Sequence, residues 1–358
     1  MGENVISLVI PTYNERDNLL PLVERLSSVF AGGKYEIILV DDNSQDGTID
    51  VANQLAAKYP VKIFVRTKER GLATAVLHGF KYAQGNFIGV MDADLQHPPE
   101  INAALLKALE GGADLAVASR YIPGGGCPNW GLTRRIISKG ASFLAHLFLP
   151  STRQVKDPMS GFFMFRRDGL EGVELSPTGY KILLEMLVMG KFSRVVEVPF
   201  IFEDRSTGAS KMKARQQIDY LKHIFSLMRR KGELARFLKF VGVGLSGTIV
   251  NLGILRLVNI FTDWSGYISL IPGIEISIIT NFALNDYFTF GDRRSAGRTF
   301  IGRLLRFNLV SLTGAVINYG IAAVLSQIAG LNIYLSDFIG IVIGFIWNYL
   351  WSNFWTWK

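Results

Sequence analysis

The sequence has a single cysteine, Cys127, and little charge for its length. A lone cysteine excludes an intramolecular disulfide framework and a zinc site built on cysteines. Charged residues make up 19% of the 358 positions and hydrophobic residues 49%, which excludes a largely disordered chain and is too apolar for one soluble α/β domain. The beginning of the chain lacks a basic segment followed by an apolar run, so we expect no cleaved export signal and an N-terminal part that folds in the cytoplasm.

Long apolar runs fill the part of the chain after residue 236. They are residues 238–261, 267–290, 305–328 and 332–357. Each approaches or exceeds the roughly 20 residues that cross a bilayer core as a helix. Lys and Arg gather before the first run and between the second and third, whereas the connections 262–266 and 329–332 have none. By the positive-inside rule, this pattern predicts an integral membrane protein with four transmembrane helices and its N-terminal domain on the cytoplasmic side.

The four runs also form two copies of one unit. When residues 236–290 are aligned with residues 303–357, 17 of the 55 positions are identical, including several glycines and asparagines. Because each copy holds two runs, both copies have the same orientation, as in parallel transporter repeats. The shared glycines allow helices to approach closely, and the shared asparagines are suited to bonding across them. A packed anchor and a transport path both fit this pattern.

Before residue 236, short β-branched runs alternate with segments of helical periodicity. The runs are residues 5–10, 36–41, 61–66, 87–94 and 114–120. Such alternation predicts a Rossmann-like α/β domain with a mostly parallel sheet. Because ligands of these sheets bind at the carboxyl ends of the strands, the residues that follow each run are the candidates for function.

Three polar segments follow these runs. Asp92-Ala93-Asp94 ends the fourth run and precedes Gln96; two carboxylates so placed can hold a hard divalent cation that bridges substrate phosphates. The second segment, residues 40–48, is rich in acidic residues, of which Asp46 also fits a helix cap. The third segment, residues 11–15, offers a tyrosine ring and a carboxylate after the first run.

Together these motifs resemble a known family. The segments IPTYNE, LVDDNSQDGT, RGLATAVLHG and MDADLQHP, in this order and spacing, resemble glycosyltransferase family 2 with the GT-A nucleotide-sugar fold. DPMSGFF (157–163) and EDRSTGASK (203–211) are similar to segments of the dolichol-phosphate mannose synthases and their bacterial polyprenyl-phosphate relatives. The apolar tail resembles the GtrA-type membrane domain. The resemblance divides the chain into a GT-A catalytic domain (1–212), an amphipathic interface segment (213–235) and a four-helix transmembrane domain (236–358).

The resemblance implies a metal-dependent, inverting transfer of one mannose from GDP-mannose to dolichyl or another polyprenyl phosphate. Asp94 and Gln96 would ligate Mg²⁺ or Mn²⁺, and the cation would neutralise the leaving nucleoside diphosphate. The resemblance also implies which residues bind the nucleotide sugar. They are Pro11, Tyr13, Glu15, Val40, Asp42, Asp92, Ala93, Asp94 and Gln96.

A lipid phosphate is already anionic at neutral pH, so the reaction needs cations that dock it rather than a general base. The candidates for acceptor docking are Arg120, Arg134, Ser138, Arg205 and Lys211; of these, Arg120, Arg205 and Lys211 join Asp94 as candidate catalytic residues. Asp157 is expected to position either the acceptor or an arginine. His97 is interpreted as part of the loop structure rather than as a catalytic base.

Delivery of a lipid acceptor needs an apolar surface at the membrane. Ile218, Leu221, Phe225 and Met228 share one stripe of a predicted helix, and Phe143, Leu144, Leu147 and Phe148 form a similar patch. Packing against the sheet is the alternative for both.

Other functions remain as alternatives. One is glucosyl transfer from UDP-glucose to a polyprenyl phosphate, and another is a flippase for lipid-linked sugars with a regulatory soluble domain. A processive polysaccharide synthase is disfavoured because the sequence has no Q-x-x-R-W segment. The net charge of +8 does not indicate nucleic-acid binding, since the basic residues cluster at the membrane boundary.

Overall fold

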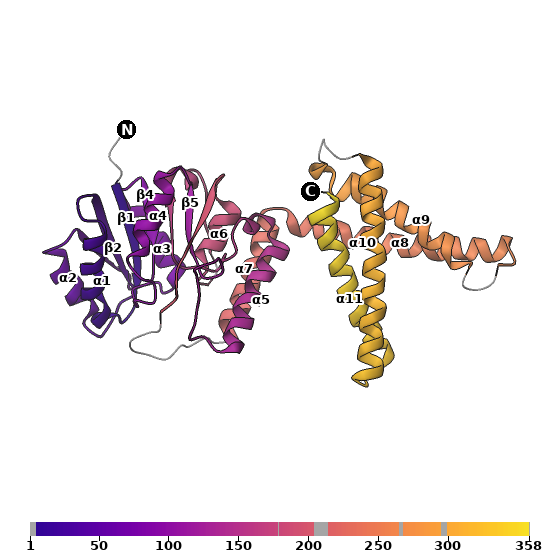
Figure 1. Cartoon of the computed structure of the whole chain (residues 1–358), viewed down its shortest axis with the longest axis horizontal. Coiled ribbons are helices and arrows are strands. Elements are labelled where there is room, and N and C mark those ends of the chain that lie inside the picture. The colour runs from indigo at the N-terminus through magenta and orange to yellow at the C-terminus, as the bar shows by residue number, and fades with distance from the viewer. Residues whose placement is uncertain (1–4, 178, 204–213, 265–267, 295–298, 358) are drawn as a thin grey trace. The chain divides into compact units, whose positions relative to one another are not determined.

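The computed structural model describes residues 5–177, 179–203, 214–264, 268–294 and 299–357. Arg205 and Lys211 lie outside the described residues. Contacts divide the chain into two compact units, Met1–Lys231 and Gly232–Lys358, whose helices and strands are labelled in Figure 1.

The first unit is built on a seven-stranded sheet. The strands are β1 (Val5–Thr12), β2 (Lys34–Asp41), β3 (Val61–Val65), β4 (Phe87–Val90), β5 (Leu115–Ser119), β6 (Phe163–Arg166) and β7 (Val195–Pro199). Their order is β3-β2-β1-β4-β6-β5-β7, and every pair is parallel except those that β6 makes with β4 and β5. The five expected runs become β1 to β5, so the predicted α/β class and mostly parallel sheet are confirmed.

Helices cover both faces of this sheet (Figure 1). They are α1 (Arg16–Val29), α2 (Thr48–Ala56), α3 (Leu72–Tyr82), α4 (Ile101–Glu110), α5 (Leu132–Phe148), α6 (Ile182–Met189) and α7 (Ala214–Arg230), with short 3₁₀ segments at Pro150–Gln154 and Arg167–Leu170. Side chains alternate along β1: Leu8 and Ile10 pack with α1, α2 and α4, whereas Val9 packs with α3 and α6. The two buried layers fix the strand register, because a slip of one residue would exchange the faces.

This topology brings the expected functional segments to one edge of the sheet. The strands β1, β2, β4 and β5 run in the same direction, so their carboxyl ends lie together. The chain reverses its strand order at β1, which lies between β2 and β4, and such a switch point is where open α/β sheets bind ligands. The antiparallel β6 starts at the same edge, directly after residues 157–162.

Helices α5 and α7 lie side by side in the first unit, joined by a hydrogen bond from the Tyr220 hydroxyl to the Ala141 carbonyl (Figure 1). The inner face of α7 is buried, but Ile218, Leu221 and Phe225 are more than half exposed. The predicted stripe was wrong for Met228, which is buried because the last turn of α7 packs inward.

Helix α5 also exposes apolar side chains. Phe143 is 61% exposed, and Leu132 and Ile136 extend the exposed apolar side chains along the helix. Leu147, which was expected in this patch, is buried because it lies on the inward face of α5.

The second unit is helical. It consists of α8 (Glu233–Phe261), α9 (Leu270–Leu284), α10 (Phe300–Ala323) and α11 (Ile333–Trp351), with π-helical turns at Asn285–Thr289, Val324–Ile328 and Ser352–Thr356 and a 3₁₀ turn at Gly291–Arg293. Within the described ranges, three helical segments are long and apolar enough to cross a membrane: Glu233–Phe261, Phe300–Ile328 and Ile333–Thr356. The expected span 267–290 corresponds to the shorter α9 and its π-helical turn, so a fourth span remains a prediction.

Close contacts between glycine and asparagine join the helices of this unit. A Cβ atom added to Gly247 of α8 would lie 2.4 Å from the Asn281 Oδ1 atom of α9, and one added to Gly314 of α10 would lie 2.2 Å from the Asn348 Oδ1 atom of α11. The amide groups of Asn281 and Asn348 therefore lie directly against these two glycines. A methyl group has no room at either position.

We expect Gly247→Ala and Gly314→Ala to separate these helix pairs and to lower the melting temperature of the full chain in detergent. Gly253 and Gly320 are the matched controls, since a Cβ at either would meet nothing within 4 Å. Alanine at the controls should change the melting temperature little, or raise it slightly through better helix propensity. Equal effects at all four positions would contradict a role for the glycine–asparagine contacts.

Candidate active site

The acidic turn after β4 comprises residues 92–96 and is held by hydrogen bonds. Asp94 and Gln96 are buried, and the Gln96 backbone N–H donates to the Asp94 Oδ1 atom at 3.2 Å. The Gln96 side chain donates through Nε2 to the Glu203 carbonyl at 3.1 Å, and the Glu203 N–H returns a bond to the Gln96 carbonyl. The amide group of Gln96 is thereby oriented, and Oε1 is the atom that it can offer to a cation.

The protein supplies only part of a metal site here. Among the described residues, no group of three or more His, Cys, Asp or Glu side chains is arranged to hold a metal ion. Mg²⁺ and Mn²⁺ accept a site in which one or two carboxylates are completed by phosphate oxygens and water. Asp94 and Gln96 fit a cation that binds together with a diphosphate.

His97 supports the acidic turn. Its ring is 3% exposed, stacks on Phe162 with ring centroids 5.1 Å apart, and accepts a hydrogen bond from the Asp92 N–H at Nδ1. Burial lowers the pKa of His97 to about 4, so its ring is neutral at pH 7. A neutral ring with Nδ1 already engaged agrees with the interpretation of His97 as loop structure.

Because the pKa of His97 is lower in the folded protein than in the unfolded chain, the stability of the protein depends on pH. The pKa of His97 is near 6.5 in the unfolded chain and about 4 in the folded chain. Its contribution to the free energy of unfolding is therefore fully present above pH 6.5 and is lost as the pH falls toward 4. The shift corresponds to about 3 kcal/mol. We expect the melting temperature of wild type to fall over this window more steeply than that of His97→Asn, whose amide oxygen can still accept the Asp92 N–H. Parallel melting curves for the two proteins would contradict this assignment.

The loops after β1 and β2 form one joined surface beside the acidic turn. The Asn14 N–H donates to the Ser44 hydroxyl at 2.8 Å, and the Glu15 N–H donates to the Thr48 hydroxyl at 2.9 Å. Asp46 accepts at 3.0 Å from the N–H of Thr48, the first residue of α2, whereas the N-cap residue of that helix is Gly47. These bonds fix the loops that carry the candidate nucleotide-binding residues.

Tyr13 and Asp42 occupy different environments on this surface. The Tyr13 ring is 48% exposed, with the Arg70 guanidinium 5.0 Å from its centroid. Asp42 is buried, and its Oδ1 accepts from Arg66 while its Oδ2 accepts from the Gly71 N–H at 2.8 Å. Arg66, which the sequence analysis missed, therefore fixes the carboxylate that is expected to bind the nucleotide.

A cavity of about 300 Å³ opens from the acidic turn toward α5 and α7. Acidic and basic groups share it, since Asp92 and Asp94 line it together with Arg120, Arg134 and Lys181. Arg120 follows β5 directly, and its guanidinium donates to both oxygens of the fully buried Asp157 at 2.7 and 2.8 Å. Of the two roles expected for Asp157, the structure supports the orientation of an arginine.

Both arginines contact one aromatic side chain. The Arg134 guanidinium lies 4.0 Å from the Trp130 ring centroid, and that of Arg120 lies 5.1 Å from it. Ser138 lines the same cavity and accepts a hydrogen bond from the Tyr121 hydroxyl at 2.7 Å. The cavity therefore offers cations and a hydroxyl, as docking of an anion requires.

The structure brings most of the expected residues to one edge of the sheet. Asp92, Asp94, Gln96, Arg120, Arg134 and Ser138 line the cavity. Pro11, Tyr13, Glu15, Val40 and Asp42 lie at or after the ends of β1 and β2, and Ala93 is buried within the acidic turn. Trp130 and Lys181 were not predicted from the sequence, because neither belongs to a motif and only the fold brings them to this cavity.

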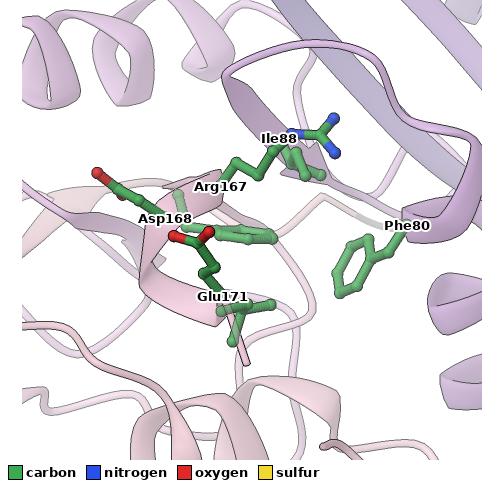
Figure 2. Close-up of a pocket in the computed structure, with 7 residues that line it drawn as sticks. Phe80, Ile88, Arg167, Asp168 and Glu171 are labelled. Atoms are coloured by element: carbon green, nitrogen blue, oxygen red, sulfur yellow. The ribbon is translucent and has the colours of Figure 1, made fainter. Parts of the chain in front are cut away.

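A second cavity, of about 360 Å³, lies elsewhere in the first unit. Figure 2 shows Asp168 and Glu171 on one side of it and Phe80 on the other. The Arg167 guanidinium at its edge donates to the carbonyls of Gly85 and Ala83 and so joins two backbone segments. It is lined by Ile88 in β4, toward the start of that strand, and it lacks the convergent cations of the first cavity.

Comparison with protein families agrees with the division into units. Residues 7–173 match the model of glycosyl transferase family 2, and residues 239–357 match the GtrA/DPMS transmembrane domain.

Individual relatives extend this match to nearly the whole chain. A dolichol-phosphate mannosyltransferase of Pyrococcus furiosus is 46% identical over 353 residues, which cover 98% of this chain and 99% of that protein. A dolichol-phosphate mannosyltransferase of Saccharomyces cerevisiae is 41% identical over 237 residues, which cover 62% of this chain and 86% of the yeast protein.

Solved structures support the fold of the first unit. Glucosyl-3-phosphoglycerate synthase of Mycobacterium tuberculosis, solved with Mn²⁺ and UDP, has a TM-score of 0.50 at 18% identity and covers 64% of this chain and 80% of that one. Mannosyl-3-phosphoglycerate synthase of Rubrobacter xylanophilus also has a TM-score of 0.50, at 19% identity, and covers 64% of this chain and 75% of that one. At this identity the likeness shows a shared GT-A-like fold.

Proposed function

Because the chain belongs to the dolichol-phosphate mannosyltransferase family within glycosyltransferase family 2, we propose that it transfers one mannose from GDP-mannose to dolichyl or another polyprenyl phosphate. The observation that carries this proposal is the cavity that Arg120 and Arg134 line together with Asp92 and Asp94 of the acidic turn. The carboxylates suit a metal-bound diphosphate, and the guanidinium groups suit a second anion.

The donor occupies the strand ends from β1 to β4. Tyr13 provides a ring face for the base, and the fixed carboxylate of Asp42 accepts from the base or ribose. Asp94 and Gln96 would hold Mg²⁺ or Mn²⁺, and the bound cation would supply positive charge to stabilise the departing diphosphate. The remaining donor contacts are assigned to Pro11, Glu15, Val40, Asp92 and Ala93.

The acceptor phosphate lies among the cations that line the same cavity. Its oxygen is ionised at neutral pH, so it attacks the anomeric carbon directly, and one displacement inverts the configuration. Support comes from His97, which is neutral and committed to the Asp92 N–H and so has no role as a base. Arg120, Arg134, Ser138, Arg205 and Lys211 dock the phosphate.

The isoprenoid chain leaves the cavity toward the membrane. Tyr220 and Ala141 line the cavity and join α7 to α5, whose exposed faces carry Ile218, Leu221, Phe225 and Phe143. An apolar face with basic residues beside it is typical of a helix at a lipid interface. We assign this face to contact with the cytoplasmic leaflet.

The second unit forms the membrane domain with four spans in two parallel repeats. Support comes from equivalent features 67 residues apart, namely the contacts Gly247–Asn281 and Gly314–Asn348 and the π-helical turns at Asn285–Thr289 and Ser352–Thr356. We assign the catalytic domain to the cytoplasmic side, which the clusters of Lys and Arg support by the positive-inside rule.

The test is a panel of radiolabelled GDP-mannose, UDP-glucose and UDP-mannose, each supplied with one polyprenyl phosphate to the purified full chain in detergent. We expect labelled glycolipid from GDP-mannose alone and only with Mg²⁺ or Mn²⁺. Formation of glycolipid from UDP-glucose would contradict GDP-mannose as the donor and identify UDP-glucose instead. Absence of glycolipid from every donor, together with movement of lipid-linked sugar across vesicles, would favour the flippase alternative.

A further inference from the structure

Lys181 lies at the start of α6 and reaches the cavity beside the acidic turn. Its ammonium donates to the Met159 carbonyl at 2.8 Å. An ammonium has three N–H groups, and within the described part of the chain this is the single hydrogen bond found for it. The ammonium also lies 4.5 Å from the Tyr180 ring centroid, and with these two contacts the side chain lines the cavity.

The segment 157–161 places two cations together. Asp157, at its start, holds the Arg120 guanidinium through two hydrogen bonds, and the Met159 carbonyl holds the Lys181 ammonium. Gly161, at its end, lies against the acidic turn, since a Cβ atom there would be 3.6 Å from the Asp92 Oδ2 atom. One short segment thus fixes two positive groups relative to the carboxylates expected at the donor.

The electrostatics of Lys181 indicate a place for an anion. Burial and the nearby Arg120 and Arg134 lower the pKa of Lys181 to about 8, although Asp157 and Asp92 act in the opposite direction. Three like charges around one cavity repel one another, and a bound dianion would relieve that repulsion. At pH 7 Lys181 remains mostly protonated and so can pair with a phosphate.

We propose that Lys181 is a binding residue for the phosphate of the lipid acceptor, which it holds jointly with Arg120 and Arg134. This inference rests on the proposed function and adds a residue to its acceptor site. The acceptor is favoured over the donor because the cavity wall next to Lys181 is formed by Tyr180, Gln217 and Tyr220 and continues to α7. The residues assigned to the base and ribose, Tyr13 and Asp42, lie instead directly after the ends of β1 and β2.

The test compares Lys181→Met and Lys181→Arg with wild type and with Lys107→Met, which removes an exposed lysine from α4. The full chain in detergent is assayed with GDP-mannose and dolichyl phosphate, with melting temperature and GDP-mannose binding measured separately. We expect Lys181→Met to raise the KM for dolichyl phosphate about 10-fold or more, as loss of a charge-assisted hydrogen bond predicts. The Kd for GDP-mannose and the melting temperature should stay near wild type.

Lys181→Arg keeps the charge and should recover part of the affinity for the acceptor, and Lys107→Met should behave as wild type. An unchanged KM for dolichyl phosphate in Lys181→Met, with wild type active, would overturn the role of Lys181 alone. An equal loss of GDP-mannose binding would also overturn it and would place Lys181 at the donor. Wild type that forms no glycolipid would overturn the proposed function and this inference with it. If Lys181→Met does not fold, the KM of Lys181→Arg for dolichyl phosphate is the test. A KM equal to that of wild type would contradict docking of the phosphate by Lys181. A rise in this KM without loss of GDP-mannose binding would support it.

Discussion

Asp94→Asn is expected to abolish mannosyl transfer while leaving the protein folded. The substitution keeps the size of the side chain and an oxygen that can accept the Gln96 N–H, so the turn after β4 should persist. It removes the negative charge that the cation needs. Because a bound metal supplies several kcal/mol of charge stabilisation to a departing diphosphate, we expect the rate to fall by about 10³-fold or more. The measurement is labelled glycolipid formed per unit time at saturating Mn²⁺.

The control for this prediction is Asp50→Asn, which removes the same charge from an exposed position on α2. It should keep wild-type activity and metal dependence. If Asp94→Asn keeps full activity, or regains it after a modest increase in Mn²⁺, then binding of the cation does not depend on Asp94. Either result would contradict the proposed site.

Asp157→Asn is expected to impair both stability and use of the lipid acceptor. Asp157 is fully buried and accepts from the Arg120 side chain twice and from its backbone N–H once. Removal of its charge leaves the buried guanidinium uncompensated, which typically costs about 3 kcal/mol or more. The melting temperature should fall by several degrees, and the KM for dolichyl phosphate should rise as Arg120 loses its orientation.

A double variant separates the two effects. Asp157→Leu combined with Arg120→Met replaces the pair by apolar side chains, an exchange that is often neutral for stability when the pair is buried. We expect it to recover most of the melting temperature of wild type but to remain inactive with the lipid acceptor. Activity in a stable double variant would contradict the assignment of Arg120 to acceptor docking.

The sequence predicted those parts of the molecule that depend on local pattern. Five apolar runs of strand length became β1 to β5, and the acidic segment that ends the fourth run became the turn with Asp94. The regular alternation of runs and helical segments is a short-range signal, and it was sufficient to predict the edge of the sheet where the candidate site lies.

What the sequence did not predict depends on contacts between distant segments. Strand β6 has only four residues, and its antiparallel pairing places it between β4 and β5. Lys181 and Trp130 reach the cavity only because the fold brings residues 120–181 around the end of β5. Met228 was placed wrongly for the same reason. Helical periodicity predicts the stripe from local sequence, whereas the burial of Met228 depends on packing against other segments.

The most direct test of the central claim compares dolichyl phosphate with unphosphorylated dolichol as acceptors of radiolabelled mannose in the purified full chain. If cations dock an already ionised phosphate and no base removes a proton, dolichyl phosphate should be mannosylated in the presence of Mn²⁺ and dolichol should not. Mannosylation of dolichol at a comparable rate would contradict the account, because an alcohol acceptor would need a general base whereas an ionised phosphate needs none.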